Sequence, residues 1–424
     1  MWSGIREREL GAPPWRYAAS VRRMRSRALE LCKTKDVISS GRGAVNSLQI
    51  DPVEARYMLA GNGNGSISVY DISQPTTVEP YSQKHEALFS IDKAHRYSVS
   101  SVRWYPVDTG IFISGSFDKH INVWDANTLE VLMQFKMPGK VFGVSMSPVS
   151  TTHMLIATGT EDYRIRLCDI SSGAFTHTLS AHRDAVWAVK WSASSEWILI
   201  SGGCDGAIRL WDIRRAGCFY VLDQHRSSAS QEGNSFPLVL FCFVYFFEAT
   251  EISRAAKTSK DATPGRVHPG LTSALDRSTA HYGTVTSLQT SRDGHYLLSA
   301  GSDSRVKLWD IERGCNTLVN YEATNINGNL TCELEVSGDK PLVFVPCLTS
   351  IQVYDMLSGR LLSTLKGHYE LVNCCAYHSQ SQELYSGSND RRILVWSPKQ
   401  SVSEDEALGT IAAQVQADED NWSD

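Results

Sequence analysis

The sequence predicts an all-β protein, a seven-bladed β-propeller with an N-terminal helical extension and a disordered acidic C-terminal tail. Three observations support this fold. Two segments align without gaps, AHRYSVSSVRW at residues 94–104 and AHRDAVWAVKW at residues 181–191. A Trp-Asp pair follows each segment 20 residues after its last Trp, and similar pairs recur along the chain. The residues that lead into these pairs alternate with period two, as half-buried strands do.

The recurring pairs set the length of the repeat. Five of the six spacings between them are 54, 44, 43, 45 and 42 residues, close to the roughly 40–45 residues of one four-stranded blade. Within one repeat, EWILISGGCDGAIRLWD at residues 196–212 contains a strand (WILIS), a tight turn (GCDG) and a second strand (AIRLWD). The seven pairs are Tyr70-Asp71, Trp124-Asp125, Cys168-Asp169, Trp211-Asp212, Trp309-Asp310, Tyr354-Asp355 and Trp396-Ser397.

Polar residues also recur at fixed offsets from the Trp. In four repeats a Ser lies ten residues before the Trp, an Asp six residues before it and a His 28 or 29 residues before it. These repeats resemble the WD-repeat family, and the resemblance implies that the four residues form a hydrogen-bonded tetrad inside each blade. The four sets are His95, Ser114, Asp118 and Trp124; His182, Ser201, Asp205 and Trp211; His281, Ser299, Asp303 and Trp309; and His368, Ser386, Asp390 and Trp396.

A His, a Ser and an Asp together also suggest a hydrolase triad. A catalytic centre requires one unique set in a cleft, whereas four copies at fixed offsets favour a structural role. Each buried polar group left without a partner costs about 1–3 kcal/mol, and a tetrad satisfies its own members. Thr158, Asp162 and Cys168 keep the same register without a His, and the first and sixth repeats lack the set. We therefore expect structural tetrads and no catalytic residue.

The N-terminal segment, residues 1–40, has a helical pattern. WRYAASVRRMRSRALELCK follows two prolines, a natural helix start. A solitary helix before a propeller must dock on the propeller or on a partner. The cluster RRMRSR also fits a nuclear import signal or a solvated face. The apolar stripe, spaced i, i+4, i+7 and i+11, consists of Tyr17, Val21, Met24 and Ala28.

The propeller itself is expected over residues 41–398, with an insertion at 226–280 between blades four and five. The first part of the insertion contains FPLVLFCFVYFF, at residues 236–247. This stretch is either a strand or helix packed on the rim or the product of a gene-model error. Its second half, residues 253–279, is polar and expected to be disordered, as is the acidic tail at 399–424.

Composition excludes several functional classes. The net charge of −5 is mild, and basic residues do not cluster with aromatic ones, so direct binding of nucleic acid is not expected. Neither a zinc-finger nor a phosphate-loop motif is present, so no metal or cofactor is expected. The ten cysteines lack a C-x-x-C pair, which favours free thiols in a reducing compartment. The apolar run of twelve residues is shorter than the roughly 20 that a membrane helix needs, so no membrane association is expected.

Residues outside the repeat consensus resemble the Cockayne syndrome A family of WD-repeat proteins. The motifs WYPVDTG, MSPVST and NTLVNY are not dictated by the tetrad or by the Trp-Asp pair. A W-D-x-R box at residues 211–214 also resembles the box of propellers that serve as substrate receptors in cullin-RING ubiquitin ligases. The matching segments are residues 56–71, 95–119, 146–160, 210–218, 316–321 and 365–388.

The resemblance implies a nuclear, non-catalytic receptor that acts in transcription-coupled nucleotide excision repair. The implied partners are the large subunit of damage-specific DNA-binding protein as adaptor, a cullin-RING ligase reached through it, the Cockayne syndrome B ATPase and stalled RNA polymerase II. The other interpretation is a general WD-repeat scaffold of a nuclear RNA or chromatin complex, without ligase attachment. The implied adaptor-binding residues are Tyr17, Val21, Arg22, Arg23, Met24, Arg25, Asp212 and Arg214.

Overall fold

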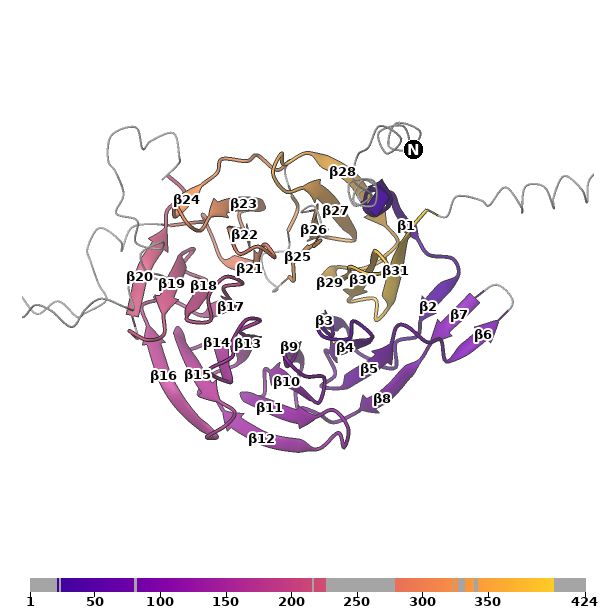
Figure 1. Cartoon of the computed structure of the whole chain (residues 1–424), viewed down its shortest axis with the longest axis horizontal. Helices are drawn as coiled ribbons and strands as arrows, with labels where there is room; N and C mark the ends of the chain where they lie inside the picture. Colours follow the sequence, from indigo (N-terminus) through magenta and orange to yellow (C-terminus); the bar gives the residue numbers. More distant parts are fainter. Residues whose placement is uncertain are drawn as a thin grey trace, which may run out of the picture.

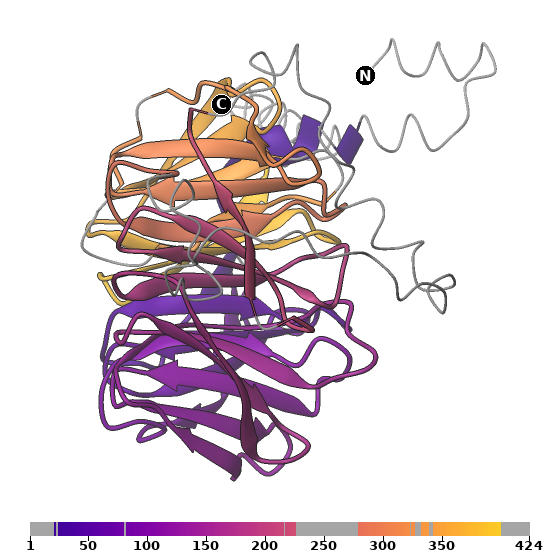
Figure 2. The same cartoon turned by 90° about the vertical axis from the view of Figure 1, so that its left-hand side faces the viewer.

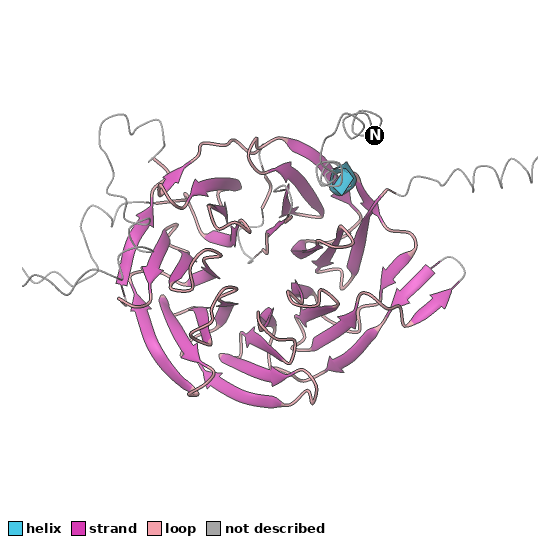
Figure 3. Cartoon of the chain, in the orientation of Figure 1, coloured by secondary structure: helices cyan, strands magenta, loops and turns pink. Residues whose placement is uncertain are grey.

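The structure, a computed structural model, is a ring of β-sheets arranged around a central axis (Figure 1). It describes residues 21–22, 24–79, 82–215, 217–225, 279–322, 324–326, 332–338 and 342–399. These residues form six four-stranded sheets, which we name blades 1 to 6, and one seven-stranded sheet, which we name the closing sheet. All pairings within the blades are antiparallel, and strands dominate the described part of the chain (Figure 3).

Each blade is a meander whose first strand lies nearest the centre of the ring (Figure 1). Blade 1 contains β3 (Val45–Ile50), β4 (Tyr57–Asn62), β5 (Ile67–Asp71) and β8 (Ala87–Ile91). Blade 2 contains β9 (Val99–Trp104), β10 (Ile111–Ser116), β11 (His120–Asp125) and β12 (Val131–Lys136), and blade 3 contains β13 (Val141–Met146), β14 (Leu155–Thr160), β15 (Arg164–Asp169) and β16 (Ala174–Ser180). Blade 4 contains β17 (Val186–Trp191), β18 (Ile198–Gly203), β19 (Ile208–Asp212) and β20 (Gly217–Leu222).

The later blades have the same order. Blade 5 contains β21 (Val285–Thr290), β22 (Tyr296–Gly301), β23 (Arg305–Asp310) and β24 (Cys315–Asn316). Blade 6 contains β25 (Glu335–Val336), β26 (Leu342–Cys347), β27 (Ser350–Asp355) and β28 (Leu361–Lys366). The closing sheet contains β29 (Val372–His378), β30 (Glu383–Ser388), β31 (Ile393–Pro398), β1 (Leu29–Leu31), β2 (Lys35–Val37), β6 (Thr77–Glu79) and β7 (Ser82–His85).

The core lies between neighbouring blades, because each sheet is apolar on both faces. Between blades 3 and 4, for example, Leu167, Val189 and Trp211 belong to one buried cluster. In β19 every residue is buried, which explains why the period-two pattern there alternates between two apolar faces and not between core and solvent. The ring closes where β29 packs against β3.

The prediction of an all-β propeller is confirmed, but the predictions of seven blades and of a helical N-terminal extension are wrong, because the described residues form six blades and contain almost no helix. Six sheets have four strands, and the last repeat belongs to the seven-stranded closing sheet. Among the described N-terminal residues only 21, 22 and 24–27 are helical, and the chain then forms β1 and β2.

The edge of β31 provides the physical reason for this difference. An edge strand presents unpaired backbone N–H and C=O groups that need partners. The N-terminal segment supplies them: Leu31 in β1 pairs antiparallel with Trp396, and Val37 in β2 pairs with Ile393. Leu29 and Val37 are also buried, at 5% and 3% exposure. The residues before and within β1 have the pattern of a helix, so these two short strands were not predicted from the sequence.

Several expectations fall on residues outside the described ranges. They concern Tyr17, Arg23, nearly all of the 226–280 insertion with its apolar run, and the tail beyond residue 399. The described chain resumes at residue 279, shortly before β21 of blade 5 begins at Val285, and the backbone N–H of Gln224 donates to the carbonyl of Thr279 at 3.1 Å. Among the described residues, no helix is both long enough and apolar enough to cross a bilayer.

Candidate functional site

The four sets of His, Ser, Asp and Trp each come together inside one sheet. In blade 4, Trp211 Nε1–H donates to Ser201 Oγ (2.8 Å), and Ser201 Oγ–H donates to His182 Nε2 (2.7 Å). His182 Nδ1–H donates to Asp205 Oδ1 (3.0 Å), because an ionised carboxylate can only accept. The other three sets make the same three bonds, at 2.7–3.0 Å, around Ser114, Ser299 and Ser386.

The serines of the tetrads cannot act as nucleophiles, because they are buried and their hydroxyls are hydrogen-bonded within the tetrad. Ser201 is fully buried, and its hydroxyl both accepts from the indole and donates to the imidazole. Burial lowers the pKa of His182, more than the nearby Asp205 carboxylate raises it. Burial alone would raise the pKa of Asp205, but hydrogen bonds from His182 and from the backbone of Arg183 and Ala207 outweigh it and lower this pKa. A neutral imidazole therefore donates to an ionised carboxylate inside the blade.

Blade 3, which lacks the His, uses an arginine in its place. Arg166 forms a bidentate pair with Asp162, with its two terminal nitrogens 3.0 and 2.7 Å from the two carboxylate oxygens. Thr158 donates to the backbone carbonyl of Arg166 at 3.0 Å, and Cys168 takes the buried position of the Trp. Arg166 was not identified from the sequence, although its place four residues after the Asp is the available signal.

The strand order separates two faces of the ring. The first strand of each sheet crosses from one face to the other, the second returns and the third crosses again. His182 precedes β17 and Asp205 lies between β18 and β19, so the tetrad His and Asp define one face, which we name the tetrad face. Asp212 ends β19 and lies at the opposite face. We name this opposite face the arginine face after two arginine residues on it that are described below, Arg214 and Arg56.

Arg214 is fixed on the arginine face by its neighbours. Its Nε and Nη2 donate to the two oxygens of Asp212 at 3.0 and 2.9 Å, and its guanidinium lies 5.7 Å from the ring of Trp197. The Arg214 side chain is 35% exposed, whereas that of Asp212 is 8% exposed. The hydrogen bond with Asp212 raises the pKa of Arg214 further. The side chain is thus charged, oriented and open to solvent on one side.

A second arginine has the same environment and was missed in the sequence. Arg56 donates through Nε and Nη2 to Asp71 at 2.9 and 2.7 Å and lies over the ring of Tyr57. It precedes β4, which places it on the arginine face. The W-D-x-R pattern could not find it, because this arginine comes just before the second strand and not from the second residue after the pair.

The N-terminal helical turns lie on the arginine face as well, beside β28 and β31 (Figures 1 and 2). The Ser26 hydroxyl lies 2.8 Å from that of Tyr377, near the end of β29. Arg27 forms a 3.2 Å ion pair with Asp355, at the end of β27. Tyr377 lies where β29 of the closing sheet reaches this face, and Asp355 lies where β27 of blade 6 reaches it.

The residues that we expect to bind the adaptor differ in exposure where the structure describes them. Val21 is partly buried, Met24 is 45% exposed, and Arg22 and Arg25 are exposed. They share a face with Asp212 and Arg214 but belong to a different sector of the ring, since Arg214 follows blade 4. A partner that contacts both regions must therefore cover a large part of the face. Within the described ranges, no group of three His, Cys, Asp or Glu side chains could hold a metal ion.

Comparisons with known proteins agree with this architecture. The family model "WD domain, G-beta repeat" matches residues 87–125, 173–212, 274–310 and 359–397. The chain is 48% identical to the WD repeat-containing protein ATCSA-1 of Arabidopsis thaliana, over the full length of both chains. It is 27% identical to the nuclear distribution protein nudF of Aspergillus niger, over 66% of this chain and 65% of that protein. It is 23% identical to Radiation-sensitive protein 28 of Saccharomyces cerevisiae, over 51% of this chain and 38% of that protein.

Proposed function

Because the chain belongs to the WD-repeat family, whose propellers generally serve as non-catalytic scaffolds, we propose that it is the substrate-recognition subunit of a cullin-RING E3 ubiquitin ligase in transcription-coupled nucleotide excision repair. The full-length relative from Arabidopsis supports the proposal, because its name carries the letters CSA. The segments that resemble the Cockayne syndrome A family, such as residues 95–119, lie in described blades and add to this support.

The geometry of the arginine face carries the proposal. Arg214, held by Asp212 and Trp197, presents a fixed and partly exposed positive charge that suits carboxylates and backbone carbonyls of a partner. The helical turns with the exposed Met24 lie on the same face. Arginine is among the residues that contribute most binding energy at protein interfaces, and both arginine and methionine are enriched there. One docking face with both features fits an adaptor that covers the ring from this side.

The mechanism we propose is positional. The adaptor, the large subunit of damage-specific DNA-binding protein, binds the arginine face and links the propeller to a cullin-RING ligase. The opposite face holds the substrate at stalled RNA polymerase II, together with the Cockayne syndrome B ATPase. Tethering raises the effective concentration of substrate lysines near the ubiquitin-charged enzyme to about the millimolar range. The propeller performs no chemistry itself and acts in the nucleus.

Affinity purification from nuclear extract tests the proposal. The Val21→Asp/Met24→Asp double variant is expected to lose the adaptor at least tenfold, because charged groups replace apolar contacts. Arg214→Met is expected to weaken adaptor recovery by a similar factor, since the partly exposed positive charge is lost. The recovered adaptor and cullin are quantified by mass spectrometry, and circular dichroism shows that each variant remains folded.

Arg96→Glu is the matched control, since this exposed arginine lies next to a tetrad His on the other face. It should keep adaptor binding. Equal recovery of the adaptor by the wild type and by both arginine-face variants would refute docking through this face. Recovery of RNA-processing or chromatin subunits without any cullin would favour the general scaffold instead.

A further inference from the structure

The two ends of the described chain meet on the arginine face, at the N-terminal helical turns formed by residues 21, 22 and 24–27. The backbone N–H of Lys399 donates to the carbonyl of Ala28 at 2.9 Å. The Lys399 side chain also pairs with Glu30, with 3.4 Å between Nζ and Oε1. The chain that follows Lys399 therefore leaves the propeller directly beside these turns.

The surface around the N-terminal helical turns carries an excess of positive charge. Residues 16–29 contain five arginines and no acidic residue. Arg27 pairs with Asp355 at 3.2 Å, whereas the exposed Arg25 has neither a hydrogen bond nor an ion pair within the described residues. Arg360 is exposed as well and precedes β28 on the same face. The described charges around the turns are five positive ones, on Arg22, Arg25, Arg27, Arg360 and Lys399, and two negative ones, on Glu30 and Asp355.

The sequence after Lys399 has the opposite charge. Residues 400–424, which we name the acidic segment, contain seven acidic residues and no basic one. The first three acids, Glu404, Asp405 and Glu406, follow Lys399 by five to seven residues. An extended chain spans about 3.3–3.6 Å per residue, so these acids can reach up to about 25 Å from Lys399. A helical stretch of seven residues is only about 10 Å long, so every arginine of the turns lies within this reach.

Attachment at Lys399 compensates for the weakness of surface ion pairs. An exposed pair of an arginine and a carboxylate contributes little by itself, because water and salt screen it. A short tether, however, raises the effective concentration of the attached group to about the millimolar range. Several weak pairs between the acidic segment and the turns can therefore form together in a large share of the molecules.

We propose that the acidic segment, led by residues 404–406, docks on the N-terminal helical turns of its own chain and covers Arg22, Met24 and Arg25. The place where the described chain ends and the complementary charges support this occupant. The docking itself does not depend on a ligase. One consequence rests on the proposed function: because the turns are the proposed adaptor site, the docked segment competes with the adaptor.

Zero-length cross-linking of the full chain tests the docking without any adaptor. Arg25→Lys keeps the positive charge and supplies an amine that a carbodiimide couples to a carboxylate in contact with it. We expect mass spectrometry to find the introduced lysine linked to residues 404–406 of the same chain. The yield should fall at least about fivefold when sodium chloride is raised to about 0.5 M, because salt screens the pairs.

Arg96→Lys is the matched control, because it places the same amine at an exposed arginine on the tetrad face. It should give no link to residues 404–406. Equal yields from the two variants would overturn the proposal. A cross-linked dimer in place of the internal link would overturn it as well, since a second copy of the chain would then be the occupant.

Adaptor binding tests the competition. The full-length variant Glu404→Gln/Asp405→Asn/Glu406→Gln is expected to bind the adaptor about threefold or more tightly at low salt, because the competing segment is weakened. The control Asp92→Asn/Asp184→Asn/Glu370→Gln removes three exposed acids from the tetrad face and should leave the affinity unchanged. Equal affinities of the two triple variants would refute the competition and leave the docking to the cross-linking result. If the wild-type chain binds no adaptor, the proposed function fails, and the cross-linking still decides the docking.

Discussion

Replacing Lys35 with methionine is expected to lower the free energy of unfolding by about 3 kcal/mol, because it leaves the buried carboxylate of Glu383 without its counter-ion. The Lys35 ammonium donates to Glu383 Oε2 (2.9 Å), to Tyr385 Oη (2.8 Å) and to the backbone carbonyl of Ile72 (2.8 Å). The Lys35 and Glu383 side chains are only 13% and 15% exposed. Burial alone would raise the pKa of Glu383, but Lys35 and the Tyr385 and Ser381 hydroxyls outweigh it and lower this pKa. Chemical denaturation of the variant and the wild type measures the difference.

The expected loss follows from the place of Lys35 in β2, the strand that joins β31 to β7 within the closing sheet. Lys140→Met is the control, since the exposed pair of Lys140 with Glu161 should contribute less than about 1 kcal/mol. Changing Glu383 to Gln in the Lys35→Met background should restore part of the stability, because the unpaired charge is removed. A Lys35→Met variant as stable as the Lys140→Met variant would show that β2 is not held by this pair.

Replacing Asp205 with alanine is expected to cost about 1–3 kcal/mol of unfolding free energy. The carboxylate accepts hydrogen bonds from His182 and from the backbone N–H groups of Arg183 and Ala207, and the variant leaves the buried His182 Nδ1–H without an acceptor. Asp184→Ala is the control, because that exposed side chain accepts a hydrogen bond only from the backbone N–H of Ala185 within the described structure. Equal denaturation midpoints for the two variants would contradict a structural tetrad.

The same pairs make stability depend on pH in a defined direction. The pKa of His182 and the pKa of Asp205 are both lower in the folded chain than the ordinary values of 6.5 and 3.8. The unfolded chain therefore binds more protons, and folding stability is fully present above pH 6.5. It should fall as the pH drops below that value, because of the four tetrad histidines, and fall again below pH 3.8. A rise in stability between pH 7 and pH 5 would contradict the neutral, buried imidazoles.

The repeat made most of the blades predictable from the sequence. Short strands and tight turns around each Trp-Asp pair give a local signal, and the offsets of Ser201, Asp205 and His182 from Trp211 follow from one blade geometry. The tetrad contacts could be named because each set lies within a single sheet. Blade 6 gave a weaker signal, since Gln352 there bonds with Tyr354 in place of a tetrad.

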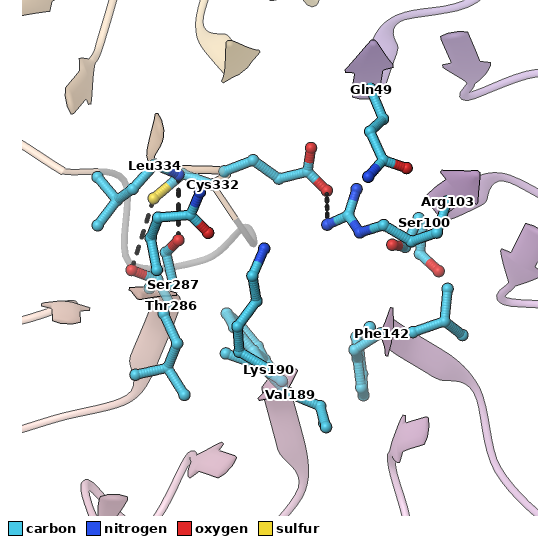
Figure 4. Close-up of a pocket in the computed structure, with 18 of the residues that line it drawn as sticks. Gln49, Ser100, Arg103, Phe142, Val189, Lys190, Thr286, Ser287, Cys332 and Leu334 are labelled. Atoms are coloured by element: carbon cyan, nitrogen blue, oxygen red, sulfur yellow. Dashed lines mark hydrogen bonds and ion pairs between the residues drawn. The ribbon is translucent and has the colours of Figure 1, made fainter. Parts of the chain in front are cut away.

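The closing sheet could not be predicted in the same way. The pairing of Leu31 with Trp396 joins residues at the two ends of the chain, and no local pattern encodes it. The charged residues that line a cavity at the centre of the ring could not be predicted as a group either (Figure 4). Arg103, Lys190 and Glu333 come from separate sectors of the ring, and only the closed ring brings their charges together. The pairing of Arg56 with Asp71 across two adjacent strands likewise had no sequence motif.

In the function proposed for this propeller, a partner covers the arginine face. Hydrogen–deuterium exchange of the full chain, alone and with the proposed adaptor, tests it most directly. We expect slower amide exchange at residues 24–31 and 212–215 in the complex, with little change at the tetrad-face residues 95–98, 282–284 and 368–371. Protection of those tetrad-face segments with no change at residues 24–31 and 212–215 would contradict the account.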